Sequence, residues 1–317
     1  MRAVRYHEHG DESVLQVDEI DRPEPGGHEL LVRVRAAGVN PVDTYFREGS
    51  YEPYTLPMIP GSELAGEVVA TGEGTPGFAA GDRVYATGLG SDHQGTYAEY
   101  ATVPIDRAAI LPADVPYEVG GAIALAGGTA WRALIDHAGL EPAEMALIHG
   151  ASGGVGHAAV QLAAAAGATV VGTAAPDYHS ALRDMGADHV YDYSRDDLAA
   201  VVGDHEPSVV LDHKLDSYLQ FDATVADTGA RVVGIGNDVP EAGFDNIALA
   251  RGKEINLTLM SLFNTPSLAD LLDRLAVLLE SEAVTAEIAE TYDLDAAAAA
   301  HRSVMEDSFL GKLAIVP

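Results

Sequence analysis

A run of glycines near the middle of the chain has the composition and spacing of a phosphate-binding turn. From position 145 the chain reads MALIHGASGGVGHAAVQLAAA, so a short apolar run (Met145–His149) leads into the turn and an alanine-rich helix follows. Glycines at the first two positions of such a turn leave room for a pyrophosphate, and the third allows close helix–strand packing. The N–H groups that open the helix then point at the anion. We therefore predict a dinucleotide site at Gly150, Ala151, Ser152, Gly153, Gly154, Val155 and Gly156, with a tight strand–helix turn as the alternative.

Other groupings of reactive residues point less clearly to chemistry. Ser152 lacks the Gly-x-Ser-x-Gly spacing of a hydrolase nucleophile. Asp212-His213-Lys214 follows a predicted strand, where successive side chains point to opposite faces, so we interpret it as a polar strand end rather than an acid–base cluster. The chain has no cysteine, which excludes disulfides, thiolate metal sites and cysteine nucleophiles. His7 and His9 form a close pair that we interpret as a solvated strand end.

The elements that position these residues belong to two kinds of domain. The first 120 residues or so are rich in Gly and Pro, and LLVRVRA at Leu30–Ala36 alternates as a half-buried strand does. This part predicts a compact, barrel-like β domain. From Val119 onward strands alternate with helices, which indicates an α/β fold with a doubly wound parallel sheet. Its six predicted strands are Met145–His149, Thr169–Thr173, His189–Tyr193, Ser208–Asp212, Arg231–Gly236 and Ile255–Phe263.

Charge is the most unusual feature of the composition. The 317 residues carry 49 acidic and 18 Lys or Arg side chains, giving a net charge of −31, and only three residues are lysine. The acids are spread along the chain, which favours a solvated acidic surface suited to high salt, as in halophiles. Such a charge argues against nucleic-acid and anionic-membrane partners. Because no long apolar run and no leader-like N-terminus are present, we expect a cytoplasmic protein without a membrane span.

The order of several short motifs resembles the zinc-independent quinone oxidoreductase and ζ-crystallin branch of the medium-chain dehydrogenase/reductase superfamily. The stretches that carry the resemblance are AAGVNPVDTYFREGSY (36–51), LPMIPGSELAGEVVATGEG (56–74), GDRVYA (81–86), GTYAEYATV (95–103), LAGGTAWRAL (125–134), HGASGGVGHAAVQLA (149–163), GADHVYDY (186–193) and the C-terminal AHRSVMEDSFLGKLAIVP. The resemblance implies a GroES-like catalytic domain at 1–121, a Rossmann domain at 122–263, and a return to the catalytic domain at 264–317. The chain departs from the family at 213–216, where His-Lys-Leu-Asp replaces a usual glycine pair.

The end of the second Rossmann strand bears on the choice of cofactor. An NAD-preferring site usually has a carboxylate there, but this chain has Ala174, which leaves room for a 2′-phosphate. Tyr178 stands where the family often has a lysine and can donate from its hydroxyl, whereas Asp177 repels a phosphate. We therefore expect NADPH and leave NADH open. Besides the glycine turn, the residues expected at the cofactor are Asn40, Thr129, Thr173, Tyr178, Tyr193, Gly236, Phe263 and Lys312. Packing or surface roles are the alternatives for the last four.

The catalytic residues that the resemblance implies are Asn40, Asp43, Tyr45 and Tyr51. Asn40 can hold the nicotinamide or a substrate oxygen, and either phenol can polarise a carbonyl or donate a proton. Alternatively, Asp43 has no catalytic role and only fixes the loop. Zinc relatives carry Cys or His ligands after the Gly-Val segment and in a Gly-His-Glu. Here the residues are Asn40 and Ser62, so we expect no zinc.

These features together predict an NAD(P)H-dependent reductase that transfers hydride to quinones or related α,β-unsaturated carbonyl compounds. An enoyl reductase or an alcohol dehydrogenase of the same superfamily is the alternative within the enzymes. A cofactor-binding structural or regulatory protein with little turnover is the alternative of another class. We expect a small-molecule substrate and a homodimer, with the predicted edge strand Ile255–Phe263 as the candidate contact.

Overall fold

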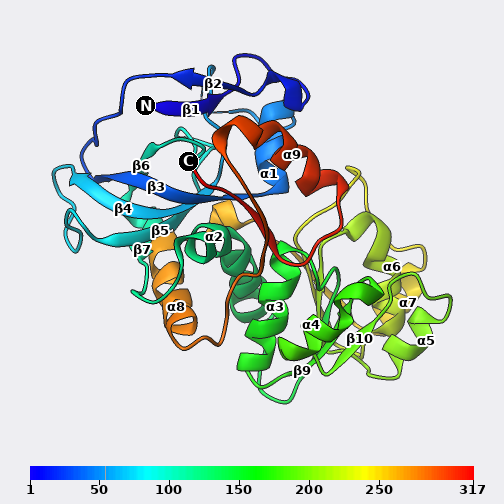
Figure 1. Ribbon diagram of the computed structural model, residues 1–317. Helices are drawn as coiled ribbons and strands as arrows, with labels where there is room; N and C mark the ends of the chain where they lie inside the picture. The colour runs from blue at the N-terminus through cyan, green and yellow to red at the C-terminus, as the bar shows by residue number, and fades with distance from the viewer. Residues whose placement is uncertain (54) are drawn as a thin grey trace. The chain divides into compact units, whose positions relative to one another are not determined.

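The computed structural model describes residues 1–53 and 55–317, and they divide into two compact units. Unit 1 consists of Met1–Gly128 and Thr265–Pro317, and unit 2 of Thr129–Asn264. Both chain ends belong to unit 1 (Figure 1). The boundary expected after residue 121 falls inside helix α2 (Tyr117–Trp131), which continues without a break past that point. No helix in the described part of the chain is long and apolar enough to cross a bilayer.

Unit 1 is built on a mixed seven-stranded sheet in the order β14-β15-β3-β4-β5-β7, with β6 also paired to β3. Its strands are β1 (Arg2–Arg5), β2 (Gln16–Glu19), β3 (Glu29–Val39), β4 (Glu63–Thr71), β5 (Arg83–Thr87), β6 (Tyr100–Pro104), β7 (Ala108–Ile110), β14 (Ile288–Tyr292) and β15 (Lys312–Ile315). Its helices are α1 (Pro41–Glu48), most of α2, whose last residues belong to unit 2, α8 (Leu268–Glu280) and α9 (Ala297–Glu306). The C-terminal elements belong to unit 1, where β15 pairs with β3.

The pairing of β15 with β3 sets the position of the polar residues of unit 1. The two strands run antiparallel, with Leu313 opposite Val39. Lys312 therefore lies beside Asn40, although the two residues are 272 positions apart in the chain. In the middle of β3 the exposed Arg33 and Arg35 alternate with buried apolar residues, as the sequence pattern predicts.

Unit 2 contains a six-stranded sheet in the order β10-β9-β8-β11-β12-β13, and every pair in it is parallel. Its strands are β8 (Met145–Ile148), β9 (Thr169–Thr173), β10 (His189–Tyr191), β11 (Val209–Asp212), β12 (Arg231–Gly234) and β13 (Asn256–Leu259). Its helical segments are the π-helical η3 (Arg132–His137), α3 (Gly154–Ala165), η4 (Pro176–Tyr178), α4 (His179–Asp184), α5 (Leu198–Gly203), α6 (Leu215–Val225), α7 (Ile247–Gly252) and η5 (Leu262–Asn264). The predicted α/β class with a doubly wound parallel sheet is confirmed.

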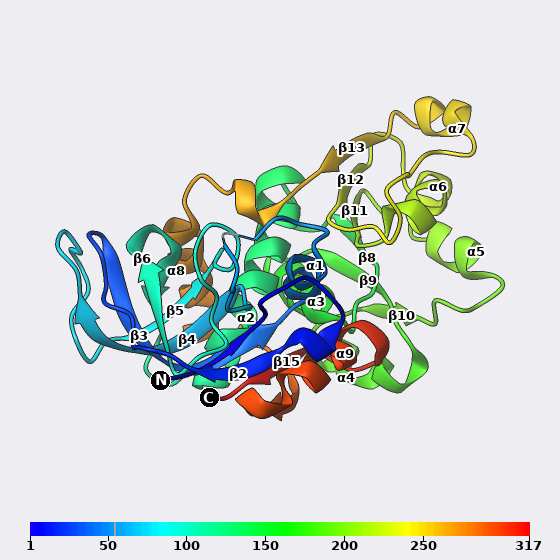
Figure 2. The ribbon, with the colours of Figure 1, turned by 90° about the horizontal axis from the view of Figure 1, so that it is seen from above.

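The last strand of this sheet is shorter than the sequence predicts. β13 ends at Leu259, opposite Gly234, because its partner β12 ends there and the ladder has no further residues to pair. Phe263 therefore lies in η5 and not in a strand. Figure 2 shows β13 next to β12 at one end of the sheet. Leu257 and Leu259 are exposed on this edge.

Candidate functional site

In unit 1, two segments that are distant in sequence meet at the end of β3. Asn40 follows that strand and starts α1, while Ser62 and Glu63 open β4. The Asn40 side-chain amide donates to Glu63 Oε1 at 2.8 Å, and the Ser62 hydroxyl donates to Asp43 Oδ1 at 2.5 Å. All four side chains are buried. The sequence treated Ser62 and Glu63 only as positions where a zinc relative differs, so it missed their place in this network.

Asp43 is held by three donors although it is almost completely buried. Its Oδ2 accepts the backbone N–H of Asn40 at 2.9 Å and the hydroxyl of Tyr97 at 3.0 Å, in addition to the bond from Ser62. Burial raises the pKa of Asp43 to about 6, and its three hydrogen bonds act in the opposite direction. Burial and the neighbouring Asp43 also raise the pKa of Tyr97. Asp43 thus caps the first turn of α1 through the N–H of Asn40, and its catalytic role stays a prediction.

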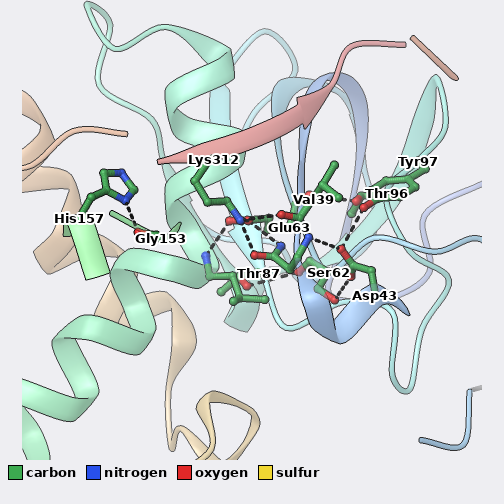
Figure 3. A network of polar contacts seen from close by, with 12 residues as sticks. Val39, Asp43, Ser62, Glu63, Thr87, Thr96, Tyr97, Gly153, His157 and Lys312 are labelled. Atoms are coloured by element: carbon green, nitrogen blue, oxygen red, sulfur yellow. Dashed lines mark hydrogen bonds and ion pairs between the residues drawn. The ribbon is translucent and has the colours of Figure 1, made fainter. Parts of the chain in front are cut away.

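Lys312 brings a positive charge into this network. Its ammonium donates to Val39 O at 2.9 Å and to Asn40 Oδ1, and it lies 3.2 Å from Glu63 Oε1 (Figure 3). The side chains of Lys312 and Glu63 are 4% and 0% exposed. Two hydrogen bonds and one ion pair thus stabilise the buried ammonium. The sequence alternative of a surface lysine is wrong, because β15 lies inside the sheet between β14 and β3.

The carboxylate of Glu63 is accommodated by a glycine. A Cβ on Gly38 would lie 2.2 Å from Glu63 Oε1, so any side chain there would displace the carboxylate. The second oxygen, Oε2, accepts the backbone N–H of Leu125 at 2.7 Å. Glu63 therefore has a fixed position, and with Lys312 it orients the Asn40 amide: the amide oxygen faces the ammonium and one amide N–H faces the carboxylate. The second N–H of that amide is the donor that these bonds leave for chemistry.

The two predicted tyrosines form an aromatic pair on the same unit. The rings of Tyr45 and Tyr51 lie 5.8 Å apart at an angle of 87°, and Tyr51 also packs edge-on against Phe46. Tyr51 is 52% exposed. Tyr45 lies on α1, and Tyr51 follows its C-terminal end, whereas Asn40 and Asp43 lie at its N-terminal end. The helix thus joins an aromatic surface to the buried polar network.

In unit 2, the glycine turn has the features that a phosphate-binding loop requires. Gly150 has a φ of +59°, which favours glycine, and a Cβ on Gly156 would lie 2.1 Å from the carbonyl oxygen of Gly150. Gly153 caps α3 without a side-chain hydrogen bond, and a Cβ on it would meet only Gly150 O, at 3.4 Å. The first N–H groups of α3 have no acceptor within the helix, so this geometry fits a bound pyrophosphate. Ser152, Gly153, Gly154 and Val155 are partly exposed, whereas Ala151 and Gly156 are buried.

The C-terminal end of β9, which lies next to the glycine turn, carries no acidic residue. Thr173 closes β9 and its carbonyl accepts the N–H of Ala151 at 2.9 Å, which ties this strand to the glycine turn. Ala174 follows and is 2% exposed. Asp177 is exposed and Tyr178 is half-buried, both in η4.

The remaining predicted cofactor residues of unit 2 lie in different places. Gly236 follows β12, and a Cβ on it would lie 2.6 Å from the carbonyl of His213, whose ring in turn lies against Gly150. Tyr193 follows β10 and is 54% exposed, and Phe263 is 38% exposed. Thr129 lies on α2 and is 8% exposed. Gly236 is thus brought close to the glycine turn by way of His213, and the roles of the others remain predictions.

Sequence reasoning missed three buried residues beneath the glycine turn: His149, Asp212 as an inward-facing acid, and Asp222. A signal for Asp222 was present. It occupies the buried stripe of α6 together with Leu215 and Leu219, at the spacing of one helix face. A carboxylate in an apolar stripe indicates a buried polar partner.

Comparisons with known proteins agree with this architecture. A family model described as "Alcohol dehydrogenase GroES-like domain" matches residues 26–113, and one described as "Zinc-binding dehydrogenase" matches residues 185–315. A quinone oxidoreductase of Rattus norvegicus is 33% identical over 328 aligned positions, which cover 100% of this chain and 98% of that protein. Quinone oxidoreductase 1 of Escherichia coli strain K12 is 38% identical over 216 positions, covering 66% of this chain and 64% of that protein.

Solved structures are similar over the whole chain. The Escherichia coli quinone oxidoreductase complexed with NADPH superposes with a TM-score of 0.90 at 29% identity and covers 100% of both chains. An NAD-dependent alcohol dehydrogenase superposes with a TM-score of 0.91 at 28% identity, again covering 100% of both.

Proposed function

Since the chain belongs to the quinone oxidoreductase branch of the medium-chain dehydrogenase/reductase superfamily, we propose that this oxidoreductase is an NADPH-dependent, zinc-independent reductase of quinones or related α,β-unsaturated carbonyl compounds. The observation that carries the proposal is the glycine turn of unit 2, where a side chain on Gly153 would enter the space in front of α3. When bound, the cofactor supplies a hydride from its nicotinamide ring.

The proposed preference for NADPH over NADH is based on the residues that follow the C-terminal end of β9. Ala174 offers no carboxylate to the ribose hydroxyls, so an NAD-type contact is missing and a 2′-phosphate meets no acid at that position. The Tyr178 hydroxyl is the group proposed to donate to the phosphate, while the exposed Asp177 weakens the preference. NADH is therefore the second cofactor to measure.

The network of unit 1 supports a role for Asn40 in orienting the reacting groups. Because Lys312 and Glu63 fix the amide, its second N–H is a preorganised neutral donor, suited to a substrate carbonyl or to the nicotinamide carboxamide. Asp43 acts through the backbone of Asn40, since it accepts that residue's N–H.

The aromatic pair provides the second part of the proposed chemistry. Tyr45 and Tyr51 present an apolar, edge-to-face surface for a flat acceptor. The exposed hydroxyl of Tyr51 is the proposed source of the proton that follows hydride arrival, directly or through water. Tyr51→Phe should then lower kcat and leave the Kd for NADPH unchanged; an unchanged kcat would remove Tyr51 from this role.

The residues do not fit a zinc ion. Zinc prefers Cys and His ligands in a tetrahedral set, but cysteine is absent from the sequence and the two corresponding segments supply Asn40 and Ser62. The Lys312 ammonium is already bonded to Asn40 and adjacent to Glu63, and a second cation there would be repelled. We therefore propose that no metal takes part in the reaction and expect the activity to withstand dialysis against a strong chelator.

The test is oxidation of NADPH and of NADH in molar KCl with a quinone, an enone, an enoyl thioester and an aldehyde as acceptors. Alcohol oxidation with NAD⁺ is added because of the similarity to an NAD-dependent alcohol dehydrogenase. Fast quinone or enone reduction supports the proposal, whereas activity confined to the thioester or the alcohol favours the alternative enzymes. Binding without turnover favours a structural or regulatory protein.

Cofactor binding is tested with Gly153→Val. The valine should abolish NADPH binding and leave the fold intact, because the backbone φ of Gly153 is an ordinary −72° and a Cβ is tolerated. Gly243→Val, at a position with open space around it, is the matched control. Unchanged affinity in Gly153→Val would refute the phosphate-loop assignment.

We also propose a homodimer and a cytoplasmic, salt-adapted protein. The exposed Leu257 and Leu259 on edge strand β13 support pairing of two such edges. Leu259→Glu should produce monomers in sedimentation experiments. The charge of −31 supports adaptation to high salt.

A further inference from the structure

Three ionisable side chains beneath the glycine turn have no role in the chemistry proposed above. His149 follows β8, Asp212 ends β11 and Asp222 lies on α6, all within unit 2. The side chains of His149 and Asp222 are 0% exposed, and Asp212 is buried as completely. Burying three such groups is costly unless they satisfy one another, so their contacts indicate what they do.

The contacts of His149 are well defined. Its Nε2 lies 2.8 Å from Asp222 Oδ1 and its Nδ1 lies 3.2 Å from Thr173 Oγ1. The imidazole stacks on the ring of Tyr218, with centroids 4.3 Å apart and planes 3° from parallel. Burial lowers the pKa of His149 to about 4, so the ring is neutral at physiological pH. With Nε2–H donating to Asp222, Nδ1 accepts from the threonine hydroxyl.

The two carboxyl groups have few donors around them. Asp212 Oδ1 accepts the N–H of Lys214 at 2.6 Å. The second oxygens of Asp212 and Asp222 are buried, and no donor of the described chain reaches either one. Each carboxyl group is nevertheless close enough to influence the pKa of the other. Two carboxylates cannot hydrogen-bond to each other, whereas an acid and a carboxylate can.

The direction of both pKa values agrees with this geometry. Burial, followed by the proximity of Asp222, raises the pKa of Asp212 to about 7. Burial raises that of Asp222 well above its ordinary value. Both shifts favour retention of a proton by the pair.

The carboxyl pair is connected to the glycine turn on three sides. His149 immediately precedes Gly150, and the ring of His213, next to Asp212, lies where a Cβ on Gly150 would be only 2.7 Å away. Thr173, which bonds to the His149 ring, accepts the N–H of Ala151. A displacement of either carboxyl group would thus also shift the backbone of the glycine turn.

We propose that Asp212 and Asp222 are positioning residues for the dinucleotide turn, and that the proton they share holds the turn in its binding conformation. Without the proton, two like charges face each other in a buried site and separate, and a further negative charge lies beneath a turn that must accept a pyrophosphate. By linkage, cofactor binding then takes up a proton. This inference rests on the proposed dinucleotide binding, which is tested separately by Gly153→Val.

Other titratable groups near the pair must be considered in any pH profile. The groups that face it are His149 from β8, His213 and Lys214 from the segment between β11 and α6, and Tyr218 from α6. The Lys214 ammonium is 2.5 Å from Asp238 Oδ2, so the carboxylate of Asp238 largely compensates its positive charge. None of these other groups is removed by an Asp-to-Asn change in the pair, so that change isolates the shared proton.

The test exploits the fact that Asp222→Asn imitates the protonated acid. The amide oxygen can accept from His149 and the amide nitrogen can donate to Asp212, so the variant should fold and bind NADPH. Calorimetric titration with NADPH in molar KCl, between pH 6.5 and 9 and in buffers of different ionisation enthalpy, gives both Kd and protons taken up. In the wild type we expect Kd to rise with pH, by up to about tenfold per pH unit for one proton.

In Asp222→Asn we expect Kd to stay near its low-pH value, with no extra proton uptake beyond what the 2′-phosphate itself contributes. Asp212→Asn should give the same flat profile, and Asp227→Asn, which neutralises an exposed acid of the same unit, should retain the wild-type slope. A wild-type slope in both pair variants, or equal affinity loss at every pH, would overturn the inference. If the wild type binds no NADPH at all, the proposed function itself has failed instead.

Discussion

Replacing Asp43 by asparagine should remove a pH-dependent contribution to the stability of the protein, and its size follows from the structure. Asp43 is 1% exposed and accepts three hydrogen bonds, yet burial outweighs them and raises its pKa from 3.8 to about 6. The folded protein therefore holds the Asp43 proton more tightly than the unfolded chain does.

The sign of the effect follows from linkage. Between pH 3.8 and 6 the folded state binds more protons than the unfolded state, so stability decreases as pH rises through this interval. The contribution is fully present below pH 3.8 and lost above 6. Since each pKa unit corresponds to about 1.4 kcal/mol, the loss amounts to about 3 kcal/mol.

The assay is urea unfolding of the wild type and of Asp43→Asn at fixed high KCl, from pH 4 to pH 7.5. Other acids contribute equally to both proteins, so the difference in unfolding free energy isolates Asp43. We expect the unfolding free energy of the variant, relative to that of the wild type, to increase by about 3 kcal/mol as the pH rises across the interval. A difference that does not change with pH would refute the reasoning, and the opposite slope would mean that the three donors outweigh burial.

Three further predictions concern the site and the surface. Gly38→Ala should displace the Glu63 carboxylate and reduce kcat, by up to about 100-fold, with little change in the Kd for NADPH; stopped-flow kinetics and titration separate the two. Lys312→Met should cost about 3–5 kcal/mol in urea unfolding by leaving Glu63 uncompensated, and Lys312→Met with Glu63→Gln should restore stability but not kcat. The thermal midpoint should rise with KCl up to about 1 M, where charges are screened within about 3 Å; an unchanged midpoint would contradict the salt-adapted surface.

Much of the fold is predictable because local patterns and the final structure agree. The alternation at Leu30–Ala36 corresponds to β3, and the apolar run before Gly150 corresponds to β8. In the glycine turn the requirement for little side chain is itself local, so the strand–turn–helix geometry follows from the spacing alone. Boundaries were less accurate where an element ends for a non-local reason, as β13 does when its partner ends.

The buried charges were not predictable in the same way. The place of Lys312 depends on β15 pairing with β3, which no local pattern around position 312 reveals. At Asp212-His213-Lys214 the expectation of opposite faces was reasonable, but one of those faces meets a buried aspartate on α6 rather than apolar side chains. Both cases involve partners that only the tertiary structure brings together.

The position of Lys312 also bears on which substrates the proposed enzyme can reduce. The two segments that carry metal ligands in zinc relatives here lie beside an ammonium that donates to Val39 O and Asn40 Oδ1 and pairs with Glu63. A buried charge that is compensated in this way stabilises Glu63 and orients Asn40, and it is not a substitute for a metal ion that binds an alkoxide. Reduction of a quinone or an enone spreads the developing charge over a conjugated system, so a neutral amide donor is sufficient. We therefore infer that exchanging the metal-type ligands for Asn40 and Ser62, with Lys312 bonded to Asn40, favours conjugated acceptors over simple alcohols, which the acceptor panel tests directly.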